Sequence, residues 1–298
     1  MAEPIPATAR RELTQLVDLA IAPDGERVAV VAQEYDATED ERYSTLFVVP
    51  TDGSADVHRL TRVADASQPR WRPDGGAIAF LASRERDRAL AVESGSPDDD
   101  DDEPEAQVWA FDLDRGGDAR QLTDREHGVR DFDWGPDGER LVVSAPDPSE
   151  EQAAYLERRE EDGPIEVERL QHKAEGVGYT DDVTSYLFVV DLATGEDRRL
   201  EGTAGAGAQE PIRGHQPRWQ PGGESIAFLT SREERPDDSN VTDVFTVDAT
   251  TGSVDRITDR GHTLYAPRWS PDGDRLAFVG RPADNWYRPA DVFLAEPR

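Results

Sequence analysis

QPRWRPDG at residues 68–75, followed by AIAFL at residues 77–81, is the most informative stretch of this sequence. The phrase recurs four more times, twice almost unchanged and twice loosely: QPRWQPGG and SIAFL within residues 216–229, APRWSPDG and RLAFV within residues 266–279, FDWGPDG at residues 132–138, and LAIAPDG at residues 19–25. Five copies in one chain indicate a repeat protein.

Each copy predicts a β-hairpin. Proline presets φ at the first turn position, Asp tolerates the second and can bond its own backbone, and Gly supplies a positive φ. A large aromatic residue ends the segment before the turn in four of the copies, and residues typical of strands alternate after it. The repeat therefore reads as strand, tight turn, strand.

Two further strands are predicted in most repeats. The third strands are LFVV at residues 46–49, VWAF at 108–111, LFVV at 187–190, VFTV at 244–247 and VFL at 292–294. After a turn that contains Gly, short fourth strands follow: HRLT at 58–61, RQLT at 120–123, RRLE at 198–201 and RIT at 256–258. Four antiparallel strands per unit, about 50 residues apart plus insertions, are typical of β-propeller blades.

The sequence thus predicts an all-β chain, a β-propeller with about five blades in one domain spanning residues 1–298. The expected blades cover approximately residues 15–62, 63–125, 126–202, 203–260 and 261–298. A stacked sandwich is the competing architecture, but it does not predict the same turn recurring in the same slot.

The charge is extreme, with 64 acidic and 33 basic residues and a net charge of −31. Lys173 is the only lysine. One interpretation is a field that attracts cationic partners. The interpretation that we favour is a salt-adapted surface, because the acidic residues occur along every segment and high salt screens their repulsion.

Composition excludes several classes of protein. No Cys is present, which rules out disulfides and thiolate chemistry. No apolar run approaches the roughly 18 residues that a membrane span needs, and the first 20 residues lack a signal-peptide pattern, so we expect a cytoplasmic protein. Nucleic-acid binding is disfavoured because a basic footprint is missing. We expect no cofactor.

Two insertions interrupt the repeats. Residues 93–105 centre on five consecutive aspartates at 98–102, which predict a disordered loop tip rather than a calcium site. Residues 146–183 begin with a capping box at Ser149 and a helix-favouring run to about Glu161, and then alternate like a strand over residues 165–170.

The longer insertion either faces a partner or substrate or covers a blade edge. Its candidate contact residues are Arg169, His172, Lys173 and Tyr179. Trp286, next to Tyr287 in a predicted loop outside the repeat pattern, is a further candidate for partner contact.

The last repeat contains no fourth strand after residues 292–294. RELT at residues 11–14 resembles the fourth-strand phrases and could supply that strand, which would close a five-bladed ring. Alternatively, the chain is a fragment of a larger ring, which we favour.

No catalytic site is predicted. Ser225 lacks the second small neighbour of a nucleophile elbow and occupies an ordinary slot after a turn. None of the five histidines has the pair spacing of a zinc site, so a structural role is expected for them. The recurring Trp71, Trp134, Trp219 and Trp269 are expected in the core between blades.

The sequence resembles the N-terminal propeller of prolyl oligopeptidase family serine peptidases, in particular the acylaminoacyl-peptidase and dipeptidyl-aminopeptidase-like members. The resemblance covers essentially the whole chain. It is carried by ELTQL before APDG within residues 12–25, GDARQLT at 117–123, ERL through GVGY within 168–179, and LFVVD at 187–191. The Pro-Asp-Gly turn by itself is weak, because TolB-like propellers share it.

The resemblance implies a propeller that sits over an α/β-hydrolase domain, screens access to it and restricts substrates to short peptides. In this family the hydrolase domain follows the propeller and carries the catalytic Ser, Asp and His, and the propeller usually has seven blades. This sequence has about five repeats and no such domain. It therefore implies a non-catalytic gating domain whose partners are a hydrolase domain and short peptides. A free-standing five-bladed TolB-like interaction module is the alternative.

Overall fold

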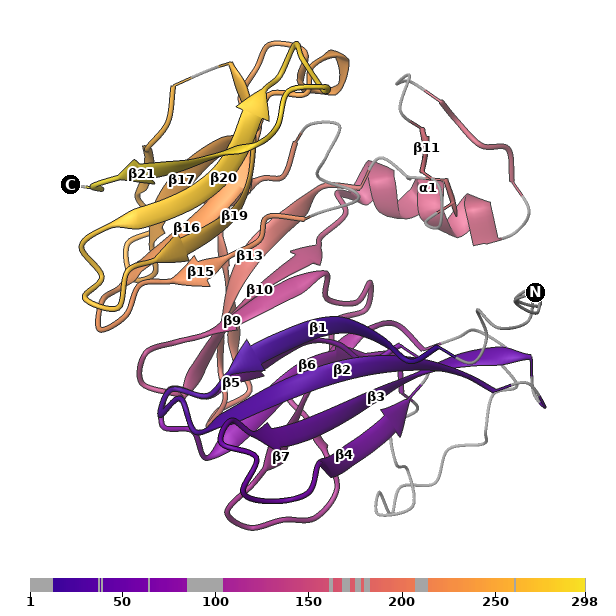
Figure 1. Cartoon of the computed structure of the whole chain (residues 1–298). Helices are drawn as coiled ribbons and strands as arrows, with labels where there is room; N and C mark the ends of the chain where they lie inside the picture. Colours follow the sequence, from indigo (N-terminus) through magenta and orange to yellow (C-terminus); the bar gives the residue numbers. More distant parts are fainter. Residues whose placement is uncertain are drawn as a thin grey trace, which may run out of the picture. The chain divides into compact units, whose positions relative to one another are not determined.

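A computed structural model describes residues 13–36, 38, 40–63, 65–84, 104–160, 163–167, 172–174, 178–179, 183–206, 214–259 and 261–297. The described part consists mainly of β-strands, with one α-helix (Figure 1). The chain divides into two compact units, Met1–Gly128 and Val129–Arg298. The prediction of an all-β propeller with five blades is confirmed.

The first unit contains two antiparallel sheets of four strands, each in sequence order. The first blade consists of β1 (Gln15–Ile21), β2 (Arg27–Asp36), β3 (Glu41–Pro50) and β4 (His58–Val63). The second blade consists of β5 (Ser67–Trp71), β6 (Ala77–Ala82), β7 (Gln107–Asp112) and β8 (Arg120–Gln121).

The second unit contains the other three blades. The third blade consists of β9 (Asp131–Trp134), β10 (Arg140–Pro146), β13 (Ser185–Asp191) and β14 (Asp197–Leu200), after which a 3₁₀ turn, η3 (Glu201–Thr203), replaces the end of the predicted fourth strand. The fourth consists of β15 (Arg218–Trp219), β16 (Ser225–Thr230), β17 (Asp243–Asp248) and β18 (Val254–Arg256), with the 3₁₀ turn η4 (Pro236–Asp238) between β16 and β17. The fifth consists of β19 (His262–Trp269), β20 (Leu276–Pro282) and β21 (Asp291–Ala295).

The predicted Pro-Asp-Gly turns join the first and second strands of the blades. In the second blade, Gly75 has a φ of 74°, and its N–H donates to the carbonyl of Arg72 at 2.8 Å. The Asp74 carboxylate accepts the N–H of Gly76 at 2.9 Å. A side chain at position 75 would strain the turn, because positive φ is readily adopted only by Gly.

In three blades, the chain at or just before the end of the first strand has a backbone feature that the sequence analysis did not predict. Gln68, Gln216 and Ala266 have left-handed φ values of 50°, 47° and 54°, and each precedes the repeated proline. Two of their N–H groups bond a side chain of the preceding blade: Gln68 donates to Asp18 at 3.1 Å and Ala266 to Gln216 at 2.8 Å. The left-handed residue thus turns a backbone donor toward the neighbouring blade.

Consecutive blades pack face to face within each unit. We call the face that meets the next blade in sequence the outgoing face, and the face that meets the preceding blade the incoming face. Ala29, Val31 and Leu46 of the first blade pack with Ile78 and Phe80 of the second. Each such contact removes apolar surface from water, which is the main favourable term in folding.

Three of the four repeated tryptophans lie in these contacts, as predicted. Trp71 and Trp219 are buried, and Trp269 is partly buried against the cluster shared by the fourth and fifth blades. The indole N–H of Trp71 donates to the carbonyl of Ala20 in the preceding blade at 2.9 Å, and that of Trp269 donates to Arg218 at 2.9 Å. Trp134 is also buried.

The insertion of the third blade begins as predicted with a capped helix, α1 (Glu150–Glu160). The Ser149 hydroxyl accepts the N–H of Gln152 at 3.3 Å, and the Gln152 side chain accepts the N–H of Ser149 at 2.9 Å. The strand predicted at residues 165–170 is wrong in its described part, because residues 165–167 form no ladder. Instead they lie along α1, where the Tyr155 hydroxyl accepts the N–H of Glu166 at 3.4 Å.

Other predictions fall partly or wholly outside the described residues. The aspartates at 98–102 do so, as do residues 11–12 of the proposed closing strand. Leu13 and Thr14 are described, but they are not in a strand, and the Leu13 side chain is exposed. The sheet of the fifth blade has three described strands, so its closure by residues 11–14 stays a prediction, as does the single-domain organisation.

Candidate functional site

The insertion brings together two of the predicted contact residues. A short hairpin pairs β11 (Lys173–Ala174) with β12 (Gly178–Tyr179), and its register places Lys173 opposite Tyr179. Lys173 is exposed, and His172, directly before the hairpin, is half-buried. Arg169 lies outside the described residues. The sequence analysis selected these residues by composition and resemblance, and it did not predict that a hairpin pairs them.

The helix before this hairpin is anchored at both ends. The Gln152 side chain donates to the Thr184 hydroxyl at 3.3 Å, which ties the start of α1 to the residue before β13. Near the other end, Arg158 pairs with Glu166 at 3.4 Å. The described part of the insertion is therefore a structured appendage of the third blade.

Trp286 lies on the connection between β20 and β21, in the fifth blade. Its backbone carbonyl accepts a bond from Arg281 at 3.1 Å, and the Arg281 guanidinium lies 5.5 Å from the centroid of the indole ring. The Trp286 side chain is 47% exposed. Tyr287 beside it is 99% exposed. Contact between these aromatic rings and a partner stays a prediction. Arg281 restricts the position of the Trp286 ring.

The serine considered as a nucleophile lies in a β-ladder, and one of the histidines lies in the core. Ser225 begins β16 and pairs with Asp248 of β17 in the ordinary ladder. His215 is fully buried, and its Nδ1 lies 2.7 Å from the hydroxyl of Ser144, which is equally buried. Neither side chain of this Ser–His pair is accessible to a substrate. Among the described residues, no group of three His, Asp or Glu side chains could hold a metal ion.

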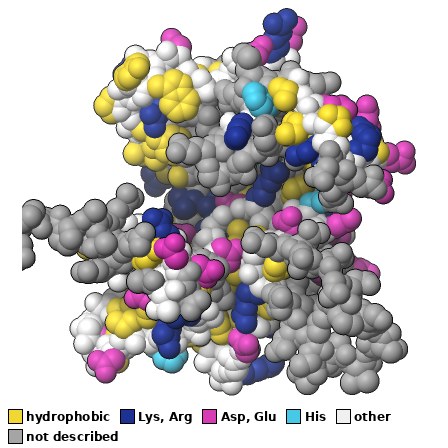
Figure 2. Space-filling view, turned by 90° about the vertical axis from the view of Figure 1, so that its right-hand side faces the viewer, with side chains coloured by type: hydrophobic (Ala, Val, Ile, Leu, Met, Phe, Trp, Pro, Cys, Tyr) yellow, Lys and Arg dark blue, Asp and Glu magenta, His cyan; other side chains and the backbone are white. Residues whose placement is uncertain are grey.

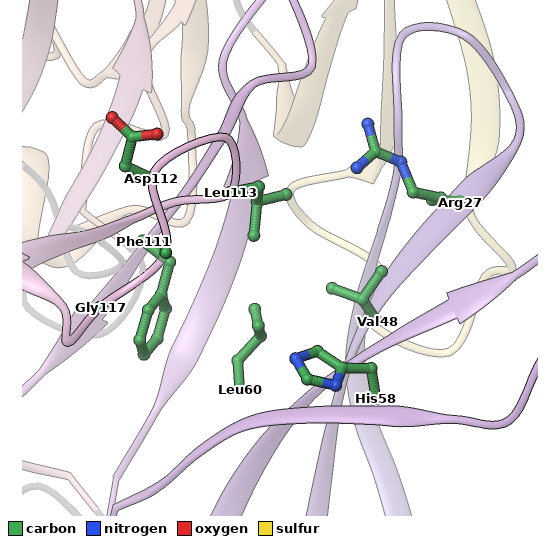
Figure 3. A pocket seen from close by; sticks show the side chains of 9 residues that line it. Arg27, Val48, His58, Leu60, Phe111, Asp112, Leu113 and Gly117 are labelled. Atoms are coloured by element: carbon green, nitrogen blue, oxygen red, sulfur yellow. The ribbon is translucent and has the colours of Figure 1, made fainter.

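A pocket of about 350 Å³ lies between the first and second blades of the first unit (Figure 3). Val48, Leu60, Phe111 and Leu113 supply apolar side chains. His58 of β4 lies beside Val48 and Leu60, while Arg27 and Asp112 lie on opposite sides of the apolar group in Figure 3. An apolar lining with a few polar groups is typical of a small-molecule or side-chain binding site.

The two charged groups of this pocket are held by neighbouring residues. The Arg27 guanidinium lies 4.8 Å from the centroid of the Trp71 ring and donates to the carbonyl of Gly75 at 3.0 Å. The Asp112 carboxylate accepts the N–H groups of Arg115 and Asp114 at 3.0 and 3.1 Å. The bond from Arg115 is the main reason why the pKa of Asp112 lies below its ordinary value. Asp112 is therefore ionised at neutral pH.

The sequence analysis missed this pocket. Its residues come from five separate segments, so no local motif marks it. One signal was present: Arg27 and Arg140 both occupy the slot after the repeated turn, and both guanidiniums lie over the tryptophan of the next blade, at 4.8 and 4.9 Å. Aligning the five repeats for charge as well as for apolar residues would have found that pair.

Side chains of both charge signs occur across the described surface seen in Figure 2. Many basic residues are engaged by acidic ones; for example, Arg199 pairs with Asp147 and Glu201, both at 2.7 Å. The hydrogen bonds that the Arg199 guanidinium donates to the Glu201 carboxylate are the main reason why the pKa of Arg199 is raised. No helix in the described part of the chain has the length and apolarity needed to cross a bilayer.

Comparison with known proteins gives one sequence relative. No family model matches the chain. The uncharacterized peptidase YuxL of Bacillus subtilis (strain 168) is 28% identical over 235 residues. The alignment covers 78% of this chain and 32% of the relative, so the chain spans about a third of the length of the curated protein that it matches.

Solved structures share the fold at lower sequence identity. Acylaminoacyl peptidase of Pyrococcus horikoshii matches 97% of this chain and 39% of its own, with a TM-score of 0.65 and 19% identity. The β-propeller domain of the trilobed protease from Pyrococcus furiosus matches 95% of this chain and 69% of its own, with a TM-score of 0.55 and 16% identity. TolB from Acinetobacter baumannii matches 95% of this chain and 65% of its own, with a TM-score of 0.54 and 16% identity. The chain is thus a β-propeller that resembles peptidases in sequence and in fold, as its repeats predicted, and that shares its fold with TolB.

Proposed function

We propose that this chain is the non-catalytic propeller of a prolyl oligopeptidase family serine peptidase, and that it gates the access of short peptides to an α/β-hydrolase domain. The observation that carries the proposal is the alignment with a peptidase over 78% of this chain. That alignment covers 32% of the relative, so most of the length of the relative lies outside the region that matches this chain.

The described residues support a gate more than a catalyst. Ser225 lies in a ladder, and the Ser144–His215 pair lies in the core. The exposed candidates, Lys173 and Trp286, lie on an appendage and a connection. Such residues could contact an incoming peptide or the hydrolase domain, because binding groups are commonly placed on loops held by a rigid scaffold. The net charge of −31 favours cationic peptides at low ionic strength.

The test combines the purified chain with the α/β-hydrolase domain proposed as its partner, in molar KCl. Hydrolysis of a short chromogenic peptide and of an unfolded polypeptide is measured with and without the chain. A gate lowers the rate on the long substrate at least about tenfold, equivalent to 1.4 kcal/mol, and leaves the short one nearly unchanged. Equal effects on both substrates, or no association, would contradict the proposal.

The second candidate is a free-standing interaction module, favoured by the TolB fold match. That function predicts a chain that is monomeric, stable alone and without effect on any hydrolase. The same experiment separates the two functions, because an interaction module leaves the length preference of the hydrolase unchanged.

A further inference from the structure

The repeats allow two junctions between blades to be compared residue by residue. One lies between the first and second blades of the first unit, and the other between the third and fourth blades of the second unit. Arg27 and Arg140 occupy the same slot, each over the tryptophan of the next blade. The N–H of Leu113 donates to Gly76 at 2.9 Å, and its counterpart Ala249 donates to Glu224 at 2.7 Å. The two junctions therefore share a backbone framework.

At each junction, the fourth strand of the earlier blade (β4 of the first blade and β14 of the third) places a different residue against this framework. His58 of β4 is paired with Val48 of β3, and in the same slot Arg198 of β14 is paired with Val189 of β13. Arg198 crosses its junction and donates from Nη2 to the carbonyl of Ala249. Leu113 is the counterpart of Ala249, and no donor among the described residues bonds its carbonyl.

The pocket of about 350 Å³ occurs at the junction that has His58 in place of Arg198. We propose that this pocket binds the arginine side chain of a peptide, which takes the position that Arg198 has at the equivalent junction. The aliphatic stem would lie on Val48, Leu60 and Phe111, and the guanidinium would donate to the carbonyl of Leu113 near the Asp112 carboxylate. The proposal concerns binding alone, so it stands whether or not the chain gates a hydrolase.

Charge does not oppose a cationic ligand here, although Arg27 lines the pocket. The Arg27 guanidinium is engaged by the face of Trp71 and the carbonyl of Gly75. The equivalent junction contains Arg140 as well as Arg198, and Arg140 pairs there with Asp137 at 2.7 Å. Asp24 occupies the slot of Asp137 and pairs with Arg27 at 3.6 Å. Arginine is favoured over lysine because its planar group is more weakly hydrated and presents several donors in a fixed geometry.

The first experiment is a calorimetric titration of the full chain with N-acetyl-L-arginine amide, in the salt that keeps the chain folded. N-acetyl-norleucine amide, which lacks the guanidinium, is the matched control ligand. We expect the arginine derivative to bind at one site and at least about tenfold more tightly than the control, because charge-assisted hydrogen bonds are roughly twice as strong as neutral ones. Equal affinity for the two ligands would overturn the proposal.

Two substitutions at one exposed position locate the site. His58→Arg supplies the side chain that fills the equivalent junction, so it should lower the affinity for the arginine derivative at least about tenfold. His58→Ala removes the imidazole ring from the pocket wall without filling the pocket, so any loss of affinity should be smaller than in His58→Arg. Unchanged binding to His58→Arg, or equal losses in both variants, would overturn the assignment.

The reciprocal substitution tests the comparison itself. Arg198→His gives the second junction the residue of the first, and we expect the stoichiometry of the arginine derivative to rise from one to two. Circular dichroism checks that the variant is folded. A folded variant that still binds one equivalent would contradict the equivalence of the junctions, and if the variant does not fold, the two His58 variants decide the proposal by themselves.

Discussion

The fourth and fifth blades have equivalent outgoing faces, but that of the fourth blade is buried and that of the fifth blade is exposed. Val244 and Val292 occupy one slot on the third strand of each blade, yet Val244 is 0% exposed and Val292 is 72% exposed. Two residues further on, Thr246 is 7% exposed and Leu294 is 69% exposed. The fourth blade is covered by Leu264, Leu276 and Phe278 of the fifth.

This comparison shows that a repeat specifies a face, and that a neighbour determines whether the face contributes to stability. The third strand of the fifth blade repeats the apolar residues of the fourth, because Val292 and Phe293 stand where the fourth blade has Val244 and Phe245. The hydrophobic contribution depends on the area removed from water, so Val292 and Leu294 contribute little where they stand exposed. Exposed apolar faces favour association, so a neighbour that covered this face would add stability.

The largest expected difference in the free energy of unfolding concerns two arginines in equivalent slots of the first strands of the fourth and fifth blades. Arg218 of the fourth blade is buried and pairs with the buried Asp131 at 3.3 Å, whereas Arg268 of the fifth blade is exposed. Arg218→Met leaves a buried carboxylate without this partner and should lower the free energy of unfolding by about 3–5 kcal/mol. Arg268→Met should change it by less than about 0.5 kcal/mol. Urea unfolding in molar KCl measures both, and equal effects would contradict the comparison.

The valine pair gives a smaller effect and tests the outgoing face directly. Val244→Ala removes two buried methyl groups, so we expect a loss of about 2 kcal/mol in the free energy of unfolding. Val292→Ala removes the same groups from an exposed position, and the expected change is below about 0.5 kcal/mol. A large loss at Val292 would mean that this face is covered in solution, and sedimentation of the same sample would show whether a second copy covers it.

The smallest effects are electrostatic and lie at the two ends of β17. Burial raises the pKa of Asp243 above its ordinary value of 3.8, although Thr258 and Arg256 bond it at 3.0 and 2.5 Å. The N–H and hydroxyl of Thr251 lower the pKa of Asp248 at the other end of the strand. The two carboxyl groups should therefore titrate on opposite sides of 3.8.

The signs of their contributions to stability follow from linkage. Asp243 binds its proton more tightly in the folded chain, so its contribution is fully present below 3.8 and is lost as the pH rises through its folded pKa. Asp248 contributes above 3.8, and this contribution is lost as the pH falls through its folded pKa. Carbon NMR titration of the carboxyl groups, assigned with Asp243→Asn and Asp248→Asn, measures both values. Shifts of the same sign would contradict the prediction.

Much of the local structure could be predicted from the sequence. The Pro-Asp-Gly turns and the third strands lie where the repeat placed them, because turn chemistry and alternation act over a few residues. The capping box at Ser149 likewise predicted the start of α1. The strand predicted at residues 165–170 failed in its described part, where polar contacts with α1 take the place of a ladder: Glu166 bonds Tyr155 and pairs with Arg158.

The candidate sites were less predictable. Lys173 and Tyr179 were selected from sequence, but their cross-strand pairing depends on a hairpin register. The pocket of the first unit could not be predicted from the sequence, because it depends on whether a side chain of one blade reaches a backbone carbonyl of the next blade. His58 and Arg198 align in the repeat and differ only in reach and charge, so only the three-dimensional junction shows which of them leaves a space.

The sequence by itself determined the repeated hairpins, the five-bladed propeller class, the net charge of −31 and the likeness to peptidases. These properties follow from local turn chemistry, periodic apolar residues and composition, which need no knowledge of neighbours. Only the tertiary structure decided which equivalent residues are buried, which donors meet an acceptor and where a pocket is left. The physical reason is that burial and hydrogen bonding are properties of contacts between blades, and identical slots acquire different contacts.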